Sequence, residues 1–553
     1  MLRKIKLIVV FGLACFSAGA GLAQRPVAIR VEAGHTIGPY DRIWTYFGAD
    51  EPNYTYAPNG QKLLRELGEL SPAPVYFRTH NLFTTGDGDG SLKWGSTNVY
   101  TEKADGTPVY NWTITDRIFD AFAAAHVRPL VEIGFMPEAL STHPEPYRHT
   151  FPKGDIFTGW TYPPKDYAKW GALVRAYAEH MKQRYGSAVD GWLWEVWNEP
   201  DIPYWYGTAE EYDRLYDVTS AAIREALPNA KIGGPESTGV ASSHAETFLR
   251  QFLEHCAHGK NAATGATGAP LDFISFHPKG RPSTVDGHVR MDIGFQLRAV
   301  ERGMKVVASY PEWKNTPIIL GENDPEGCAA CQGAANGYRN GALYGVSEAE
   351  VMARIAELAR RYDVHVQGTV TWAFEFENQP YFAGFRELAT NGVDKPVLNV
   401  FRMMGMLGGE QVQVESSGAL SLDDMLQGDA TGAGDIDAIA TRQGNEVSIL
   451  VWNYADDDVL APDPRVTLKI AGLGNGSVQE EEFRMDKNHS NAYTVWQSMG
   501  SPAQPTPEQQ KKFEEAGGLE RISAPHAMQI QEGNAAVEIT LPRQGVTLIR
   551  LSR

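Results

Sequence analysis

The chain has 553 residues and a mass of 60.9 kDa, which is too long for one ordinary domain and predicts two or three. Hydrophobic residues make up 42% and charged residues 21%, so the chain can bury a large core and lacks the composition of a disordered protein. Asp and Glu number 68 against 50 Lys and Arg, a net charge of -18. Because phosphate binding needs clustered positive charge, we expect no nucleic-acid partner.

The N-terminal residues 1–23 are typical of a bacterial signal peptide. A positively charged start (3–6) precedes the short apolar run 7–16, and Gly21-Leu22-Ala23 supplies small residues for cleavage. We therefore expect export to the periplasm or the medium. The run is too short to span a bilayer, and no later stretch is typical of a membrane span. Lipid attachment at Cys15 is a minor alternative.

Three cysteines would remain after cleavage, and an odd number is not a disulfide framework. Cys328 and Cys331, separated by two alanines, could form a small disulfide, half of a zinc site or two free thiols. Zinc is the least favoured of these, because no second Cys/His pair at ligand spacing follows. Cys256 lies between two histidines that we expect on a surface helix. We predict no metal site.

Short apolar runs alternate with helical segments between residues 44 and 407. The runs that predict strands are 44–47, 75–78, 129–133, 191–197, 231–233, 273–276, 317–320 and 368–372. The segments with helical spacing are 60–70, 115–126, 166–185, 209–226, 245–255 and 347–362. Strands and helices in this alternation predict a (β/α)8 TIM barrel. The stretch 80–110, rich in Gly, Thr and Asp, is its clearest long loop.

Residues 408–553 predict an all-β accessory domain that resembles a sandwich. Helical spacing nearly disappears there, except at 507–516. The runs that predict strands are 436–454, 465–470 and 535–541, and Gly444-Asn445 would divide the first into a hairpin. The segment 24–43 contains another strand, which we expect to join this C-terminal sheet because the ends of a chain often meet.

Two glutamates directly follow predicted barrel strands, and the active site of such a barrel lies at the carboxyl ends of its strands. Glu199 follows the fourth strand and Glu322 the seventh. Two carboxylates that face one cavity suit glycoside hydrolysis, and a separation of about 5 Å predicts retention through a glycosyl-enzyme. Their repulsion is expected to leave one ionised and the other protonated. Either could instead be a helix-cap neighbour or an ion-pair partner.

The motifs around these residues resemble those of a known family. Trp197-Asn198-Glu199-Pro200, followed by Tyr204-Trp205, is similar to the acid/base motif of retaining glycosidases with (β/α)8 barrels. Further segments narrow the resemblance to glycoside hydrolase family 39, which contains β-xylosidases and α-L-iduronidases. These segments are 77–80, 233–235, 272–277 and 395–399. The stretch 50–56 resembles bacterial β-xylosidases.

The resemblance implies roles for several side chains. Glu199 would be the general acid/base and Glu322 the nucleophile. Asn198 would hydrogen-bond the sugar 2-hydroxyl, a contact that tightens in the transition state. Arg78 would keep the nucleophile ionised, because a nearby cation lowers the pKa of a carboxyl group. An ion pair of purely structural importance is the alternative for Arg78.

Three aromatic or imidazole side chains complete the expected site. His80 and His277 would donate to sugar hydroxyls, although a lone histidine is often a structural group. Trp372 ends the eighth strand and would stack on the apolar face of the sugar, with a plain core position as its alternative.

Some segments depart from the family pattern or lie less clearly in the site. Pro278-Lys279-Gly280 and the stretch 323–328 differ from many members, which puts the sugar specificity in doubt. Lys279 could meet a substrate carboxylate or be a charge on the rim. Glu236 is expected near the cavity, whereas Glu375 and Glu377 are expected in solvent.

The sequence therefore predicts a secreted retaining exo-glycosidase that releases xylose from the non-reducing end of xylo-oligosaccharides by double displacement. No metal or organic cofactor is expected, because two carboxylates and water suffice. Another pentosidase or a uronidase, similar to α-L-arabinosidases or α-L-iduronidases, is the first alternative. A carbohydrate-binding protein without catalysis is the second. Nothing in the sequence predicts the oligomeric state.

Overall fold

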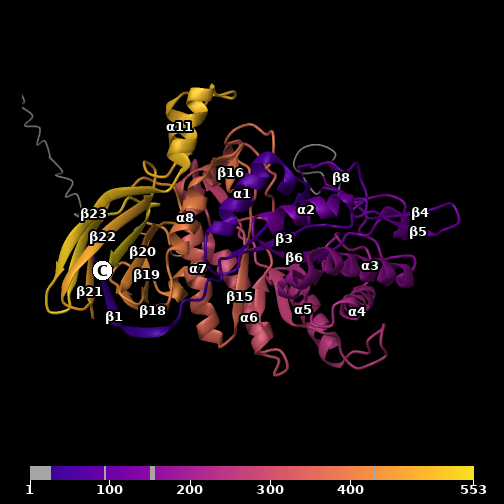
Figure 1. The fold of residues 1–553 in the computed structure, drawn as a ribbon. Helices are drawn as coiled ribbons and strands as arrows, with labels where there is room; N and C mark the ends of the chain where they lie inside the picture. The colour runs from indigo at the N-terminus through magenta and orange to yellow at the C-terminus, as the bar shows by residue number, and fades with distance from the viewer. Residues whose placement is uncertain (1–25, 93–94, 150–155, 158, 429, 433) are drawn as a thin grey trace, which may run out of the picture.

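The computed structural model describes residues 26–92, 95–149, 156–157, 159–428, 430–432 and 434–553. The predicted signal peptide and Cys15 lie outside these residues. A barrel surrounded by helices forms one part of the molecule, and a β-sheet domain lies beside it (Figure 1). Within the described ranges, every helix is too short or too polar to cross a bilayer.

Eight strands close into a parallel barrel, which confirms the predicted fold class. In order around the barrel they are β2 (Tyr46–Ala49), β3 (Tyr76–Thr79), β6 (Arg128–Ile133), β9 (Leu193–Val196), β10 (Lys231–Thr238), β11 (Phe273–His277), β14 (Ile318–Leu320) and β15 (Val366–Trp372). Their residues are almost all buried, because side chains fill the barrel on one face and helices cover the other.

Helices surround the barrel, and most of them match predicted segments. They are α1 (Pro58–Glu69), α2 (Thr113–Ala124), α3 (Tyr167–Tyr185), α4 (Ala209–Ala226), α5 (Ser243–His258), α6 (Ile293–Ala308), α7 (Ala342–Tyr362) and α8 (Pro396–Gly405). The sequence pattern does not predict α6 and α8. Short elements lie in the connecting loops: η1 (Pro52–Tyr56), β4 (Tyr100–Glu102), β5 (Pro108–Tyr110), η2 (Glu138–Leu140), β7 (Arg148–His149), β8 (Ile156–Phe157), η3 (Gly186–Gly191), β12 (Ser283–Val285), β13 (His288–Arg290), η4 (Ala334–Asn340), β16 (Ala389–Thr390) and β17 (Val393–Asp394).

The C-terminal domain is built on a sheet of nine strands. In order across the sheet they are β23 (Glu520–Ile530), β22 (Gly476–Met485), β25 (Val546–Ser552), β20 (Glu446–Tyr454), β19 (Asp435–Gln443), β18 (Glu410–Ser416), β1 (Val27–Pro39), β21 (Arg465–Ala471) and β24 (Ala535–Thr540). Its helices are α9 (Leu422–Gln427), α10 (Ala492–Ser498) and α11 (Pro507–Gly517). The N-terminal strand β1 pairs with β18 and β21, as expected from the sequence.

The sheet curls around one apolar core. Strands from both ends of the order contribute to that core, for example Val478 of β22 and Val537 of β24. A flat sheet could not bring these residues together, so the domain takes the layered, sandwich-like form that its alternating strands predict. The expected hairpin is also present, because β19 and β20 pair across Gly444 and Asn445.

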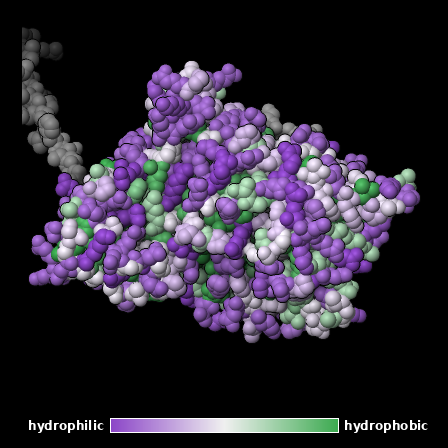
Figure 2. All heavy atoms as spheres, viewed as in Figure 1, coloured by the Kyte–Doolittle hydropathy of each residue, from purple (hydrophilic) through white to green (hydrophobic). Residues whose placement is uncertain are grey.

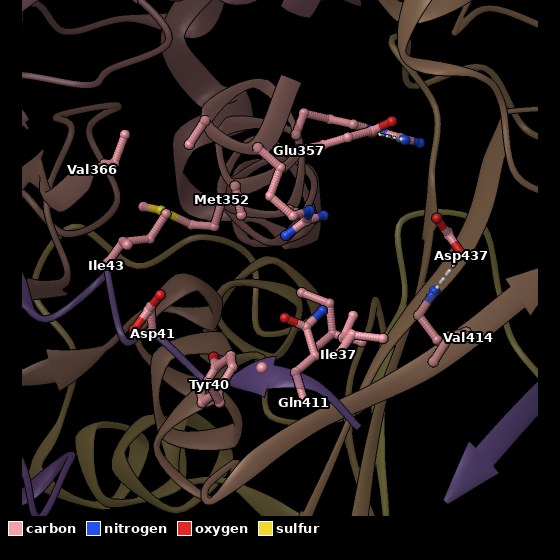
Figure 3. Close-up of a pocket in the computed structure, with 18 of the residues that line it drawn as sticks. Ile37, Tyr40, Asp41, Ile43, Met352, Glu357, Val366, Gln411, Val414 and Asp437 are labelled. Carbon is pink, nitrogen blue, oxygen red and sulfur yellow. Dashed lines mark hydrogen bonds and ion pairs between the residues drawn. The ribbon is translucent and has the colours of Figure 1, made fainter. Parts of the chain in front are cut away.

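The β domain contacts the barrel through charged side chains and encloses a cavity with it. The Asp456 carboxylate accepts hydrogen bonds from the backbone N–H groups of Asp292 and Ile293, at the start of α6. A cavity of about 830 Å³ lies between the domains, with Tyr40, Met352 and other side chains on its wall (Figure 3). Figure 2 shows hydrophilic side chains over most of one face of the molecule, as the high charge of the chain leads us to expect.

Candidate active site

The two glutamates that the sequence singles out meet at the carboxyl ends of the barrel strands. Glu199 follows β9 and Glu322 follows β14. One carboxylate oxygen of each, together with a ring nitrogen of His277, lie within 4.8 Å of one another. Both carboxylates are nearly buried, with 5% and 3% of the residue surface exposed. The barrel therefore brings two residues that are distant in sequence together at the ends of its strands.

The backbone after each of these strands aims the carboxylate into the pocket. Trp197 and Glu199 have positive φ angles of 74° and 44°, and the Glu199 N–H donates to the Glu236 carbonyl at 2.7 Å. On the other side of the pocket, a Cβ atom at Gly321 would lie 2.1 Å from the Glu236 carboxylate. Glycine directly before Glu322 therefore lets the Glu236 carboxylate and the His277 ring approach, because a side chain at this position would displace them.

Lys279 lies between the two carboxylates. Its Nζ is 3.0 Å from Oε1 of Glu199 and 2.5 Å from Oε2 of Glu322. The lysine side chain comes from the loop after β11 and is 20% exposed. An ammonium group thus bridges the two carboxylates in this structure, which is a closer involvement than a charge on the rim.

His277 links the pair to a third carboxylate. Its Nδ1 is 3.0 Å from Oε1 of Glu199, and its Nε2 is 2.7 Å from Oε2 of Glu236. Burial lowers the pKa of the imidazole, but the charge of Glu322 and the hydrogen bonds from Glu199 and Glu236 outweigh it and raise the pKa to about 9. At neutral pH the ring is therefore an imidazolium that donates a hydrogen bond on each side.

Both carboxylates of the pair are held ionised, which differs from the expected split into one ionised and one protonated group. Burial favours the protonated form of Glu199 and of Glu322. The charges of Lys279 and His277 outweigh burial and bring the pKa of both groups well below the usual range. Their mutual repulsion is smaller than this attraction, because two cations lie closer to each carboxylate than the other carboxylate does.

Arg78 is fully buried and performs both of the roles considered for it. Its guanidinium forms an ion pair with Glu322 at 3.0 Å and donates to Oδ1 of Asn198 at 3.1 Å. The same group pairs with Glu132 at 3.0 Å and with Glu195. The arginine therefore positions Glu322 and the Asn198 amide, and it also neutralises two carboxylates inside the barrel.

Glu132 and Glu195 are members of the site that the sequence analysis does not identify. Each is a single carboxylate within an apolar strand, in β6 and β9, and both are completely buried. Burial raises the pKa of Glu195 well above its usual value, although Arg78 opposes this. A lone acid in an apolar strand requires a buried cation, and this signal could have identified both residues.

His80 and Trp372 lie beside Arg78 and are covered in this structure. His80 Nδ1 is 2.8 Å from Glu132, and the residue is 1% exposed. The Trp372 indole N–H donates to Asp50 at 2.9 Å, and its ring lies 4.9 Å from the Arg78 guanidinium. Trp372 is 2% exposed and packs against Arg78, so it orients its neighbours in this structure, and its stacking on a sugar stays a prediction.

The sequence model for Glycosyl hydrolases family 39 matches residues 28–534, almost the whole described chain. The chain belongs to this family. A β-xylosidase of Caldicellulosiruptor saccharolyticus is 27% identical over 435 residues, which are 75% of this chain and 78% of the relative. An α-L-iduronidase of Mus musculus is 26% identical over 542 residues, 92% of this chain and 78% of that one.

A solved structure shows the same fold. The crystal structure of a monomeric β-xylosidase from Caulobacter crescentus CB15 superposes with a TM-score of 0.74 at 21% identity, covering 95% of this chain and 99% of the other. The protein is thus a family 39 glycoside hydrolase with a TIM barrel. Its relatives include two kinds of glycosidase at similar identity, so the family alone does not identify the sugar.

The loop after the nucleophile of this family 39 hydrolase is held by buried ion pairs. Asp324 accepts a hydrogen bond from the Trp372 backbone N–H at 3.0 Å and pairs with Arg386 at 2.9 Å. Arg386 also pairs with Glu326. Cys328 and Cys331 form a disulfide in the same loop, rather than half of a zinc site or two free thiols. The loop is therefore fixed to the end of β15 close to Glu322.

Two acidic residues beyond β15 do not lie where the sequence places them. Glu375 and Glu377 are buried, with 1% and 8% of their surfaces exposed, so the expectation of solvated side chains is wrong. Glu375 accepts a hydrogen bond from the Gly392 N–H at 2.6 Å. Glu377 accepts from the N–H groups of Asn59 and Gly60 at the start of α1. Both satisfy backbone donors that lie far away in the sequence.

The catalytic groups also have the spacing of a metal site, but a lysine already supplies the positive charge. Glu199, His277 and Glu322 could reach one ion. The Lys279 ammonium bridges the same two carboxylates at 3.0 and 2.5 Å. A metal ion would have to displace this cation and the His277 proton together, so the donor set does not fit a resident metal.

Proposed function

We propose that this family 39 hydrolase is a retaining exo-glycosidase that removes one terminal sugar by double displacement. The observation that supports this most directly is the approach of a Glu199 oxygen to a Glu322 oxygen within 4.8 Å. Carboxylates about 5 Å apart suit direct attack on the anomeric carbon, whereas about 6.5–9.5 Å leaves room for an intervening water. The spacing favours the covalent route.

Each step then has a residue to perform it. Glu322, kept ionised by Arg78, attacks the anomeric carbon while Glu199 gives its proton to the departing oxygen. Glu199 then takes a proton from water, which attacks the same carbon and releases Glu322 and the sugar. Asn198, fixed by Arg78, lies beside the nucleophile, where a 2-hydroxyl would accept its N–H.

An exo mode of action is supported by the burial of the pair. Glu199 and Glu322 expose only 5% and 3% of their surfaces, and Asn198 exposes 2%. An open groove that admits the middle of a polysaccharide would leave these groups more accessible. A narrow pocket admits the end of a chain.

Lys279 must move before Glu199 can act as an acid. A cation 3.0 Å from a carboxylate stabilises its ionised form, so Glu199 cannot hold a proton while the ammonium stays in place. The bound sugar therefore has to offer the ammonium another partner. The nature of that partner separates two candidate substrates.

The first candidate is a terminal β-D-xyloside, so that the protein releases xylose from xylo-oligosaccharides. Relatives named as β-xylosidases, at 27% and 24% identity over most of this chain, support it. In this case Lys279 would turn to a sugar hydroxyl. The ammonium would then gain a neutral partner in exchange for two carboxylates, which is an unfavourable exchange.

The second candidate is a terminal uronide, and the position of Lys279 favours it. An α-L-iduronide has the same ring configuration at C1 to C4 as a β-D-xyloside and carries an additional carboxylate at C5. That carboxylate would give Lys279 a charged partner and so release Glu199 for protonation. Relatives named as α-L-iduronidases, at 26% and 24% identity over about nine-tenths of this chain, agree with it.

Two aryl glycosides with the same leaving group, one a β-D-xyloside and the other an α-L-iduronide, test these candidates. Lys279→Met is the informative variant. For a uronidase we expect kcat/KM on the iduronide to fall by about 10- to 100-fold, since a charged hydrogen bond contributes roughly 1.5–3 kcal/mol. For a xylosidase the xyloside is the better substrate, and the variant leaves the ratio of the two rates unchanged.

The retaining mechanism itself is tested without reference to the sugar. Proton NMR of an early reaction mixture identifies the anomer that forms first, and we expect it to have the configuration of the substrate. A 2-deoxy-2-fluoro glycoside with a good leaving group should label Glu322, detectable by peptide mass. Formation of the opposite anomer would contradict the proposal.

We also propose that the protein is exported. The sequence of residues 1–23 supports this, and the Cys328–Cys331 disulfide suits an oxidising compartment. Amino-terminal sequencing of the mature protein from the periplasm or medium should begin at Gln24. A lipid-modified N-terminus at Cys15 would instead place the protein on a membrane.

A further inference from the structure

We propose that Tyr147, Tyr162 and Tyr206 form a platform that binds the sugars on the leaving-group side of the cleaved bond. This tyrosine platform rests on the proposed glycosidase function and extends it, because it assigns a site for the second and third sugars of an oligosaccharide. The three residues lie on two neighbouring loops of the barrel, one between β6 and α3 and one between β9 and α4.

The platform begins at the general acid. Tyr204 follows Glu199 on the same loop, and its carbonyl accepts the indole N–H of Trp197 at 2.7 Å. The residue is 8% exposed. Its ring lies 6.1 Å from that of Phe135, which in turn packs on Trp197 at 4.8 Å, two residues before Glu199. Tyr204 thus forms the wall of the pocket next to the acid.

From this wall a row of rings leads outward. The Tyr147 ring lies 5.5 Å from that of Tyr204, at an angle of 75°. Tyr206 is 6.4 Å from Tyr147, and Tyr162 stacks on Tyr206 at 4.8 Å and 18°. His143 stacks on the far side of Tyr162 at 4.4 Å. The row therefore connects the buried acid with the surface.

Tyr206 marks the outer part of the row. Its exposed fraction is 49%, and among the described residues it is the only aromatic one with a large exposed apolar surface. Its backbone is nevertheless fixed, because its N–H donates to the Thr161 carbonyl at 2.8 Å and the Tyr147 N–H donates to the Gly159 carbonyl at 2.8 Å. The two loops hold the rings in place before any ligand binds, which lowers the entropy cost of binding.

The chemistry of the row suits a sugar chain. The C–H faces of a pyranose pack against aromatic rings, and phenol groups can exchange hydrogen bonds with hydroxyls. A tyrosine can therefore bind both the apolar face and the hydroxyl groups of a sugar. The position determines which part of the chain binds there. Glu199 protonates the leaving oxygen, and whatever lies beyond it on this loop must contact the leaving group.

Substitution of the exposed ring tests the platform. We would compare kcat/KM for oligosaccharides of two, three and four sugars with that for an aryl glycoside of the same terminal sugar, in the wild type and in Tyr206→Ala. The terminal sugar is xylose or a uronic acid, whichever gives the better aryl substrate. Since a stacked aromatic contact contributes about 0.5–1.5 kcal/mol, the ratio of tetrasaccharide to aryl rate should fall roughly two- to twelvefold. Tyr381→Ala, a half-buried tyrosine on the loop before β16, is the matched control and should leave the ratio unchanged.

A binding measurement keeps the test independent of turnover. The tetrasaccharide that the wild type hydrolyses should bind Glu322→Ala, as followed by saturation-transfer NMR, and its outer sugars should lose their signal in the double variant with Tyr206→Ala. An unchanged ratio of rates together with unchanged NMR contacts would overturn the platform and leave the glycosidase proposal intact. A dimer that dissociates in Tyr206→Ala, with saccharide binding unchanged, would also overturn it, because the exposed ring would then serve protein association. Absence of any glycoside hydrolysis would instead contradict the proposed function.

Discussion

Two regions of this molecule bury networks of charged side chains, and they differ in how the charges are neutralised. At the junction between the barrel and the β domain, Arg354 pairs with Glu350 at 2.6 Å and with Asp435 at 3.1 Å. Trp452 donates to Glu350 at 2.5 Å. At the catalytic end of the barrel, Lys279 is the cation between two carboxylates.

The difference lies in the cation. The Arg354 side chain is 6% exposed and bonds to groups from α7, β19 and the chain before α9, so it has no path to another partner. Lys279 is 20% exposed and projects from a loop. Both networks contain buried carboxylates with shifted pKa values, so a shifted pKa alone does not mark the catalytic site. A cation that substrate can displace distinguishes the two.

The largest effect is expected for the nucleophile. Glu322→Ala should reduce kcat by about 10⁴-fold or more on every glycoside, because no other group can form the covalent intermediate. Steady-state assays with an activated aryl glycoside measure this. Circular dichroism should show a folded barrel, and substantial remaining turnover would mean that another residue attacks the sugar.

The acid/base is expected to show a selective loss. Glu199→Ala should slow substrates with poor leaving groups by about 10²–10⁴-fold, the usual contribution of general acid catalysis, and activated aryl glycosides much less. Azide should restore part of the rate by attacking the glycosyl-enzyme. A loss that does not depend on the leaving group would show that Glu199 is not the acid.

Sequence alone locates this pair because parallel barrel strands end at one rim. Glu199 and Glu322 follow apolar runs directly, so their side chains must lie at that rim whatever their distance in sequence. The sequence does not predict that Lys279 lies between them, because the position of a lysine ammonium group on a loop depends on how that loop folds. Nor does the sequence place Glu236 against His277, since that contact follows from an irregularity within β10, where Glu236 has a positive φ angle and the register shifts between Pro235 and Ser237.

The helices that the sequence does not predict have their cause outside their own segments. The N-cap residue of α6, Asp292, makes no side-chain hydrogen bond, and the first N–H groups of the helix donate to Asp456 of the β domain. The first N–H groups of α1 donate likewise to Glu377. By contrast, α4 has a complete capping box at Thr208 and begins where its sequence predicts. The cap of α6 thus lies outside its own segment, which hides the start of this helix from a local pattern, whereas the apolar spacing of α1 predicts that helix without a local cap.

A smaller effect is expected for Glu236, which acts through His277. Glu236→Gln removes one of the negative charges that hold the pKa of His277 at about 9, so that pKa should fall. Because the imidazolium donates to Glu199, the alkaline limb of the pH profile of kcat/KM should move to lower pH. At neutral pH we expect a loss of about 10- to 100-fold from poorer positioning.

The pH profile separates positioning from simple destabilisation. A variant that is merely less stable would lose activity without moving the alkaline limb. Glu236→Asp retains the charge at a greater distance from His277 and should shift the limb less. If the limb stays in place in Glu236→Gln, His277 does not titrate in the profile and the link between the three residues has no catalytic role.

The smallest effect on turnover is expected at the junction, where the effect on stability is large. Arg354→Met leaves Glu350 and Asp435 buried without their cation, and removal of one partner of a buried pair costs about 3–5 kcal/mol. Burial and Asp435 already raise the pKa of Glu350, so the variant should regain stability as the pH falls and the carboxyl groups take up protons. Chemical denaturation at several pH values measures this.

Arg361→Met is the control variant. It breaks the exposed pair with Asp423 and should cost about 0–1 kcal/mol of stability. A change of more than about twofold in kcat/KM of folded Arg354→Met would show that the junction, too, supports catalysis.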